Sequence, residues 1–193
     1  MRTRTLVVPM LCLLAAASPD ARQKKNTGAP ETFTSNIRAV GGGGGAAAAT
    51  IEIAIQRYTP DADRKSVEEA LKTGGYPAFL TALRKAPQVG TVNFGEQKWA
   101  IRWAREQPGA KYHRNIVVVT DQPIVFLGGA RANAKPRAGY EVGVLQFEVD
   151  DVGLGKGTMA GAARVKPGGE TGVTIDDYAD KPIELQTVTR NLK

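Results

Sequence analysis

Ile51-Glu52-Ile53-Ala54-Ile55-Gln56 is the stretch of sequence that indicates the fold most directly. Its three isoleucines recur at every second position, and the polar residues Glu52 and Gln56 lie between and after them. Successive side chains of a β-strand point to opposite faces of the sheet, so this alternation is typical of a strand with one buried face. The segment therefore predicts a half-buried β-strand.

The same period of two recurs later in the chain. Leu145 to Val149 and Ile183 to Gln186 alternate in the same way, and turn residues such as Pro167-Gly168-Gly169 separate the runs. Short strands at this spacing favour an antiparallel β-barrel or β-sandwich of about 8–10 strands. The further strands that we expect are Thr32–Val40, Val89–Phe94, Lys98–Arg105, Asn115–Thr120, Ile124–Leu127, Thr158–Val165 and Gly172–Tyr178. The glycine run at 41–45 is predicted to be a flexible turn between two strands.

One region departs from the strand pattern and predicts an inserted helical hairpin over about residues 60–86. Thr59-Pro60 is expected to cap and start the first helix, and Gly74-Gly75 is expected to stop it. Pro77 starts the second helix, which ends before Pro87. The apolar side chains of the hairpin must cover an open end or a face of the sheet, where the hairpin could also serve as a lid.

The N-terminus has the three parts of a cleavable export signal. Arg2 and Arg4 are positive, residues 6–14 are largely apolar, and Ala15 to Ala17 provide small residues for cleavage. The apolar run is about a dozen residues, whereas a membrane-spanning helix needs roughly 20. We expect a signal peptide over 1–17 (or 1–21), a disordered leader over 22–31 and a single β-rich domain over 32–193. The protein is thus expected in the bacterial periplasm or outside the cell, without a transmembrane segment in the mature chain.

The inventory of reactive residues argues against most conventional active sites. The chain has one cysteine, Cys12, which the signal cleavage removes, and one histidine, His113. Thiol catalysis and a metal site of several histidines are therefore excluded, and neither Ser35 nor Ser66 has the context of a catalytic nucleophile. The run Gly153 to Thr158 is partly similar to a phosphate-binding loop, but it lacks the glycine at 150 and the hydroxyl at 157 that the motif needs. We expect no metal and no cofactor.

Two groups of residues are candidates for ligand binding. Trp99 and Trp103 alternate with polar residues and are expected on one face of a strand, where they either stack on a ligand or pack in the core. The second group is a basic loop containing Arg131, Lys135 and Arg137, which could bind an anionic polymer or be a solvated loop. A net charge of +7 spread along the whole chain does not indicate a nucleic-acid-binding protein.

The sequence thus leads to three hypotheses about function. The first is a secreted, non-enzymatic protein that binds a small molecule, a glycan or an envelope component, or that has a structural role. The second is a hydrolase or isomerase that depends on carboxylates, for which Glu141, Glu148, Asp150 and Asp151 supply the candidate acids. The third is an interaction module of a cell-envelope complex, which would show an exposed apolar patch.

Overall fold

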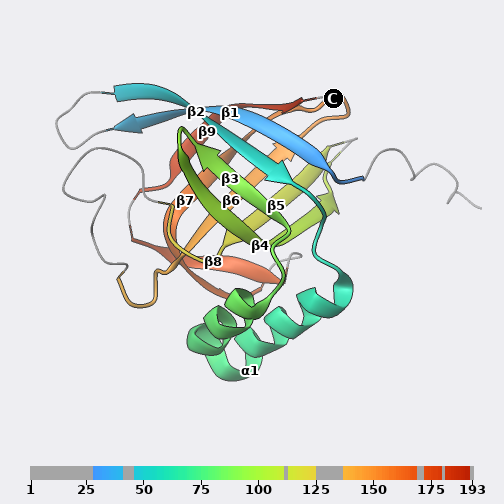
Figure 1. The fold of residues 1–193 in the computed structure, drawn as a ribbon, viewed down its shortest axis with the longest axis vertical. Coiled ribbons are helices and arrows are strands. Elements are labelled where there is room, and N and C mark those ends of the chain that lie inside the picture. The colour runs from blue at the N-terminus through green and yellow to red at the C-terminus, as the bar shows by residue number, and fades with distance from the viewer. Residues whose placement is uncertain are drawn as a thin grey trace, which may run out of the picture.

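The computed structural model describes residues 28–40, 46–110, 113–124, 137–168, 172–179 and 181–191. It is mainly β, with one helical region below a barrel (Figure 1). The predicted export signal and most of the predicted leader lie outside the described residues. In chain order the elements are β1 (Glu31–Val40), β2 (Ala46–Ile55), α1 (Asp61–Lys85), β3 (Gly90–Phe94), β4 (Gln97–Pro108), β5 (Arg114–Thr120), β6 (Val142–Val149), β7 (Leu154–Pro167), β8 (Val173–Tyr178) and β9 (Ile183–Asn191).

Eight of these strands form a closed antiparallel β-barrel. Strands β1 to β7 pair in chain order, β7 then pairs with β9, and β9 returns to β1. The long strand β7 continues beyond the barrel, where its second half pairs with β8. Of the two architectures that the sequence allowed, the barrel is therefore the correct one. The expected strand at Ile124–Leu127 lies largely outside the described residues, and Ile124 itself is a buried core residue.

The interior of the barrel is packed with apolar side chains. The alternation at Ile51, Ile53 and Ile55 directs all three isoleucines inward, where each is at most 1% exposed. They share this core with Phe33 of the neighbouring strand β1 and Phe147 of β6, whose rings lie edge to face at 5.1 Å. A core of this kind stabilises the fold without a disulfide.

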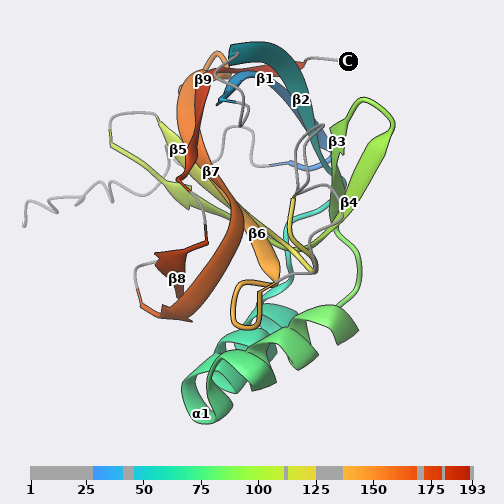
Figure 2. The same ribbon diagram turned by 90° about the vertical axis from the view of Figure 1, so that its left-hand side faces the viewer.

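The helical region α1 consists of two helices that meet at Gly75, as predicted. Gly75 adopts φ 66° and ψ −162°, a conformation that only glycine adopts easily, and the chain changes direction there. Both helices pack against the outer face of the barrel rather than across its open end (Figure 2). Val67, Leu71, Phe79 and Leu83 supply the apolar contacts.

The expected capping role of Thr59 is wrong. Pro60 occupies the N-cap position, and no side chain caps the helix there. The Thr59 hydroxyl instead accepts a hydrogen bond of 2.8 Å from the Ala104 N–H, and the Thr59 N–H donates to the Ala104 carbonyl. Thr59 therefore attaches the start of the helix to β4, a pairing that sequence spacing cannot reveal.

The run Gly153 to Thr158, which is partly similar to a phosphate-binding loop, lies at the hairpin turn between β6 and β7 and at the start of β7. β7 begins at Leu154 and pairs antiparallel with β6. A Cβ atom on Gly155 would come within 1.7 Å of the Glu148 carbonyl oxygen. Glycine is thus required at this position by the close approach of the two strands, and the motif needs no phosphate to explain it.

Candidate functional site

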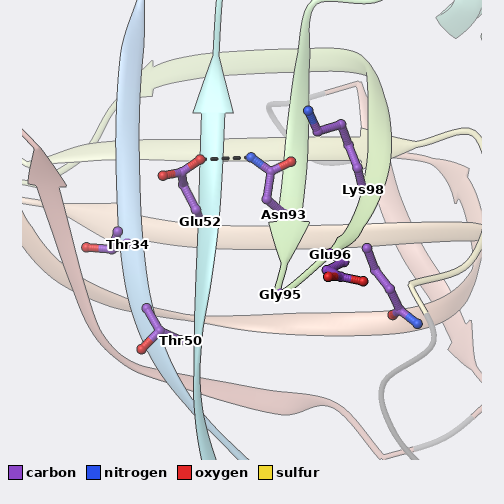
Figure 3. Close-up of a pocket in the computed structure, with 8 residues that line it drawn as sticks. Thr34, Thr50, Glu52, Asn93, Gly95, Glu96 and Lys98 are labelled. Atoms are coloured by element: carbon purple, nitrogen blue, oxygen red, sulfur yellow. Dashed lines mark hydrogen bonds between the residues drawn. The ribbon is translucent and has the colours of Figure 1, made fainter.

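Four polar side chains stand in register across the outer face of the barrel. Thr34 on β1 is paired with Glu52 on β2, Glu52 with Asn93 on β3, and Asn93 with Lys98 on β4. We call these four residues the polar row; Figure 3 shows them from outside the barrel. Neighbouring strands lie about 4.8 Å apart, so the row extends over roughly 14 Å. Each of its residues alternates with an inward-facing apolar residue, which is why all four face outward.

The polar row lies in a shallow groove of about 420 Å³ that is open to solvent. The β3–β4 turn, Gly95-Glu96, forms one wall, and Gly95 has the positive φ of 55° that this tight turn requires. Thr50 and Gln97 complete the lining. The groove thus presents hydroxyl, amide, carboxylate and ammonium groups within one short surface.

Asn93 is the residue of this groove whose hydrogen bonding is incomplete. Its Nδ2 donates a bond of 2.8 Å to Glu52 Oε1, and this bond fixes the orientation of the amide because a carboxylate can only accept. The Asn93 Oδ1 atom is buried and has no hydrogen-bond partner in the structure. Figure 3 shows it turned away from Glu52. A buried acceptor without a partner costs about 1–3 kcal/mol. A ligand in the groove could donate to this oxygen only after a shift of the amide or of a neighbouring side chain that exposes it.

The shared face that we expected for the two tryptophans is wrong. A β-bulge between Ile101 and Trp103 shifts the register of β4 against β5. Trp99 therefore lies in the barrel core, while Trp103 faces outward into the apolar layer beneath α1. The exposed fractions are 7% for Trp99 and 0% for Trp103. Both rings are thus packed in the interior of the protein, which was the alternative to ligand stacking that the sequence allowed.

Of the basic loop, the structure describes only Arg137; Arg131 and Lys135 lie outside the described residues. The Arg137 guanidinium stacks on the Tyr140 ring, 4.9 Å from its centroid. The Tyr140 hydroxyl donates to Asp177, and this bond helps to hold the pKa of Asp177 below its usual value. Arg164 pairs with the neighbouring Asp176 at 2.9 Å. The ion pair joins β7 to β8, and the Tyr140 hydrogen bond joins β8 to the segment before β6.

The four carboxylates considered for catalysis have separate local roles. Glu148 lies 2.7 Å from His113, and both side chains are exposed. Asp150 accepts hydrogen bonds from backbone N–H groups of the β6–β7 turn, and Asp151 is exposed. The Glu141 N–H donates to the Tyr76 hydroxyl. Within the described residues, no hydrogen bond or ion pair brings two of these four to a common partner.

A buried cluster of charged residues, which the sequence did not predict, lies at one end of the barrel. Arg114 donates to Glu31 at 3.1 Å and to Glu106 at 3.2 Å, and the Tyr58 hydroxyl donates to Glu31 at 3.3 Å. Arg190 approaches Glu31 to 3.9 Å. We call these five residues the end cluster; they come from β1, the β2–α1 connection, β4, β5 and β9.

The end cluster is balanced in charge and lies close to the core. The side chains of Glu31 and Glu106 are 6% and 9% exposed. Burial raises the pKa of Glu106 and, with the help of Glu31, the pKa of Tyr58. Because two arginines that remain charged neutralise the two carboxylates, the cluster is suited to joining strand ends and poorly suited to transferring protons.

No signal in the sequence brings the end cluster or the polar row together. Glu31 falls at the edge of the predicted leader, and Glu52 and Lys98 read as ordinary solvent-facing residues. The residues that lie beside Glu52 and Lys98 are determined by the register of paired strands, and the β2 and β3 strands of this row are far apart in the chain. The sequence pattern predicted only that Glu52 and Lys98 face away from the apolar side of their strands.

The remaining findings concern metals, membranes and known proteins. The described residues contain no group of histidine, cysteine and acidic side chains able to hold a metal ion. None of the helical segments in the described ranges is long and apolar enough to span a bilayer. Comparison with protein-family models, curated proteins and solved structures finds no significant match.

Proposed function

We propose that this chain is an exported, non-enzymatic binding protein whose polar row holds a hydroxyl-rich ligand, such as a glycan of the cell envelope. The observation that carries the proposal is the polar row itself: four hydrogen-bonding side chains in register, with an unpartnered amide oxygen among them. A linear ligand lying across the strands would meet all four in turn.

The chemistry of the row suits alcohol groups. A hydroxyl both donates and accepts, so it can donate to Asn93 Oδ1 or Glu52 and accept from Lys98. One acidic and one basic residue flank the amide, so the row itself favours neither a strongly anionic nor a strongly cationic ligand. This balance supports a neutral, polar ligand.

The packing of the barrel supports an external site over an internal one. Phe33, Ile53, Trp99 and Leu145 fill the interior, and each is at most 7% exposed. Ligand-binding barrels hold small molecules where the interior leaves space for them. In this protein the outer groove is the better candidate, because the two tryptophans first considered are both buried, on opposite faces of β4.

The proposal is tested by nuclear magnetic resonance titration of the ¹⁵N-labelled protein with soluble oligosaccharides from envelope polymers. We expect the largest shift changes at the backbone amides of Thr34, Glu52, Asn93 and Lys98. Asn93→Leu should weaken binding roughly tenfold, because the amide oxygen and its bond to the ligand are both lost.

Thr91→Ala is the matched control. Thr91 lies two residues from Asn93 on the same strand, and it does not line the groove. This variant should bind as the unmodified protein does. Shift changes confined to another surface, or an Asn93→Leu variant with unchanged affinity, would refute the assignment of the site.

A further inference from the structure

Strands β1 and β9 carry the same outward-facing motif, in which threonine, threonine and asparagine occupy alternate positions. The motif consists of Thr32, Thr34 and Asn36 on β1 and of Thr187, Thr189 and Asn191 on β9. The two strands are antiparallel neighbours (Figure 1), and Thr34 pairs with Thr189 at the centre, so that each asparagine lies opposite a threonine of the other strand. We call these six residues the Thr–Asn array.

The Thr–Asn array is an uncharged continuation of the polar row. Thr34 belongs to both groups, and none of the six side chains of the array is charged. Residues between them, such as Phe33 and Val188, point into the core. The array therefore faces outward, and each of its residues is partly or fully exposed. A ligand in the polar row that extends past Thr34 meets Thr189 on the next strand, about 4.8 Å away.

The two asparagines of the array present hydrogen-bond donors. Thr34 Oγ1 donates to Asn191 Oδ1 at 3.4 Å, and Thr50 Oγ1 donates to Asn36 Oδ1 at 3.3 Å. The amide oxygens are thus engaged, whereas the side-chain N–H groups of both asparagines have no partner in the described part of the chain. An amide NH₂ group can only donate, so its complement in an uncharged ligand is a strong neutral acceptor such as a carbonyl oxygen.

An exposed aliphatic side chain lies beside the array. Leu154 on β7 is paired with Thr189 and is 50% exposed. The backbone around it is held in place, because Asp150 Oδ1 accepts a bond of 2.8 Å from the Leu154 N–H and the Gly153 carbonyl accepts one of 2.8 Å from the Arg190 N–H. Covering the apolar surface of Leu154 with a methyl group of a ligand would be favourable.

We propose that the Thr–Asn array and Leu154 select a glycan that carries acetamido groups; this inference rests on the proposed function. One acetamido group answers both features, since its carbonyl oxygen accepts from an asparagine N–H and its methyl group packs against Leu154. Asn191 lies two residues beyond Thr189, so Asn191 and Leu154 are diagonal neighbours about 7–8 Å apart, with room for the group between them. An acetylated nitrogen is neutral, which suits the uncharged array.

The test compares chito-oligosaccharides with cello-oligosaccharides of the same length. The two series have the same linkage and differ at one ring position, where the first carries an acetamido group and the second a hydroxyl. In nuclear magnetic resonance titrations of the ¹⁵N-labelled protein, the chito-oligosaccharide should bind roughly tenfold more tightly. Its shift changes should include Leu154, Thr189 and Asn191 in addition to the polar row.

Asn191→Asp tests the donor directly. The carboxylate retains the shape of the side chain and the bond from Thr34, but it can only accept. This variant should bind the chito-oligosaccharide roughly tenfold more weakly and the cello-oligosaccharide about as the unmodified protein does. Leu154→Ala should also reduce the preference for the acetylated series. Asn115→Asp makes the same change at an exposed position of β5 outside the array, and it should alter neither affinity.

The outcomes separate this inference from the proposed function. Equal affinities for the two series, with shift changes in the polar row, would overturn the acetamido selection and leave the proposed function intact. A preference for the acetylated series that survives in Asn191→Asp would also overturn it. Shift changes at the array alone would support the acetamido site and count against the polar row. Absence of binding by both series would overturn both proposals.

Discussion

At the scale of single residues, the local environment reverses roles that residue type alone would suggest. Trp103 looked like a partner for Trp99, yet one bulge turns it to the opposite face of β4. Glu31 looked like part of a solvated leader, yet it is a buried partner of Arg114. In both cases a small change of backbone register or strand boundary decides between burial and exposure.

Glu106 should make the stability of the protein depend on pH. Burial raises its folded-state pKa above the ordinary value of 4.5, so the folded protein holds this proton more tightly than the unfolded chain does. The corresponding stabilisation is complete below the unfolded pKa and is lost as pH rises through the folded pKa. Glu106→Gln should remove this loss.

The measurement is urea unfolding of both proteins at intervals from about pH 4 to about pH 8. The free energy of unfolding of Glu106→Gln, minus that of the unmodified protein, should increase with pH above about 4.5 and then level off. Taking this difference cancels the contribution of other carboxylates, such as Asp177, whose lowered pKa acts in the opposite direction. A difference that stays constant with pH would contradict the expectation.

At the scale of elements, the helical hairpin shows how two short helices form one covering layer. Gly75 lets the chain turn, and Phe79 and Leu83 of the second helix then join Val67 and Leu71 of the first over the same apolar surface. That surface is the outward face of strands β4 to β8, including Trp103 and Val119. The hairpin is thus a permanent second layer of the core, which does not support the idea of a lid.

Gly75→Ala should destabilise the protein by about 1–3 kcal/mol through the backbone alone. An added Cβ at Gly75 meets no atom within 4 Å, so no steric clash contributes. Urea unfolding followed by circular dichroism measures the effect. Lys72→Ala, at an exposed position of the same helix, should change stability by less than about 0.5 kcal/mol. Equal stability of the two variants would show that the turn at Gly75 is not required.

At the scale of the whole molecule, the barrel combines a filled interior with a polar outer surface and two charge clusters. The end cluster joins five strand ends or connections at one end of the barrel. The cluster around Tyr140 joins the extension of β7 and β8 to the body. With no cysteine among the described residues, packing and ion pairs of this kind must stabilise the fold.

Export should be visible in the N-terminus of the protein recovered from a bacterial host. We expect the exported form to begin at Ser18, or at Arg22 if the second cleavage site is used. Leu11→Arg places a charge in the apolar region of the signal, so this variant should stay in the cytoplasm with Met1 retained or with only Met1 removed. Intact-mass measurement of the periplasmic and cytoplasmic fractions tests both statements.

Lys24→Ala is the control for this experiment, because it lies after both cleavage sites. It should be exported and cleaved like the unmodified chain. Recovery of the uncleaved chain from the periplasm would contradict the predicted cleavage, and failure of export in the unmodified protein would contradict the predicted location.

The sequence by itself determined the elements of this protein. The alternation at Ile51 to Ile55 and its repeats located most of the strands, and Gly75 with Pro77 located the break between the helices. These signals are local, because side chains return to the same face every two residues in a strand and about every 3.6 residues in a helix. The same alternation also predicted that Glu52 and Lys98 face away from the core.

Only the tertiary structure decided how these elements meet. Barrel closure depends on β9 pairing with β1 and β7, strands separated from it by different lengths of chain. The partners of Asn93, Arg114 and Thr59 likewise follow from register and from one bulge. Such pairings are set by the packing of the whole core, because a shift of one residue in register would move every side chain of a strand to the other face. The candidate site is therefore a property of the assembled barrel, even though the local pattern already predicted the outward facing of Glu52 and Lys98.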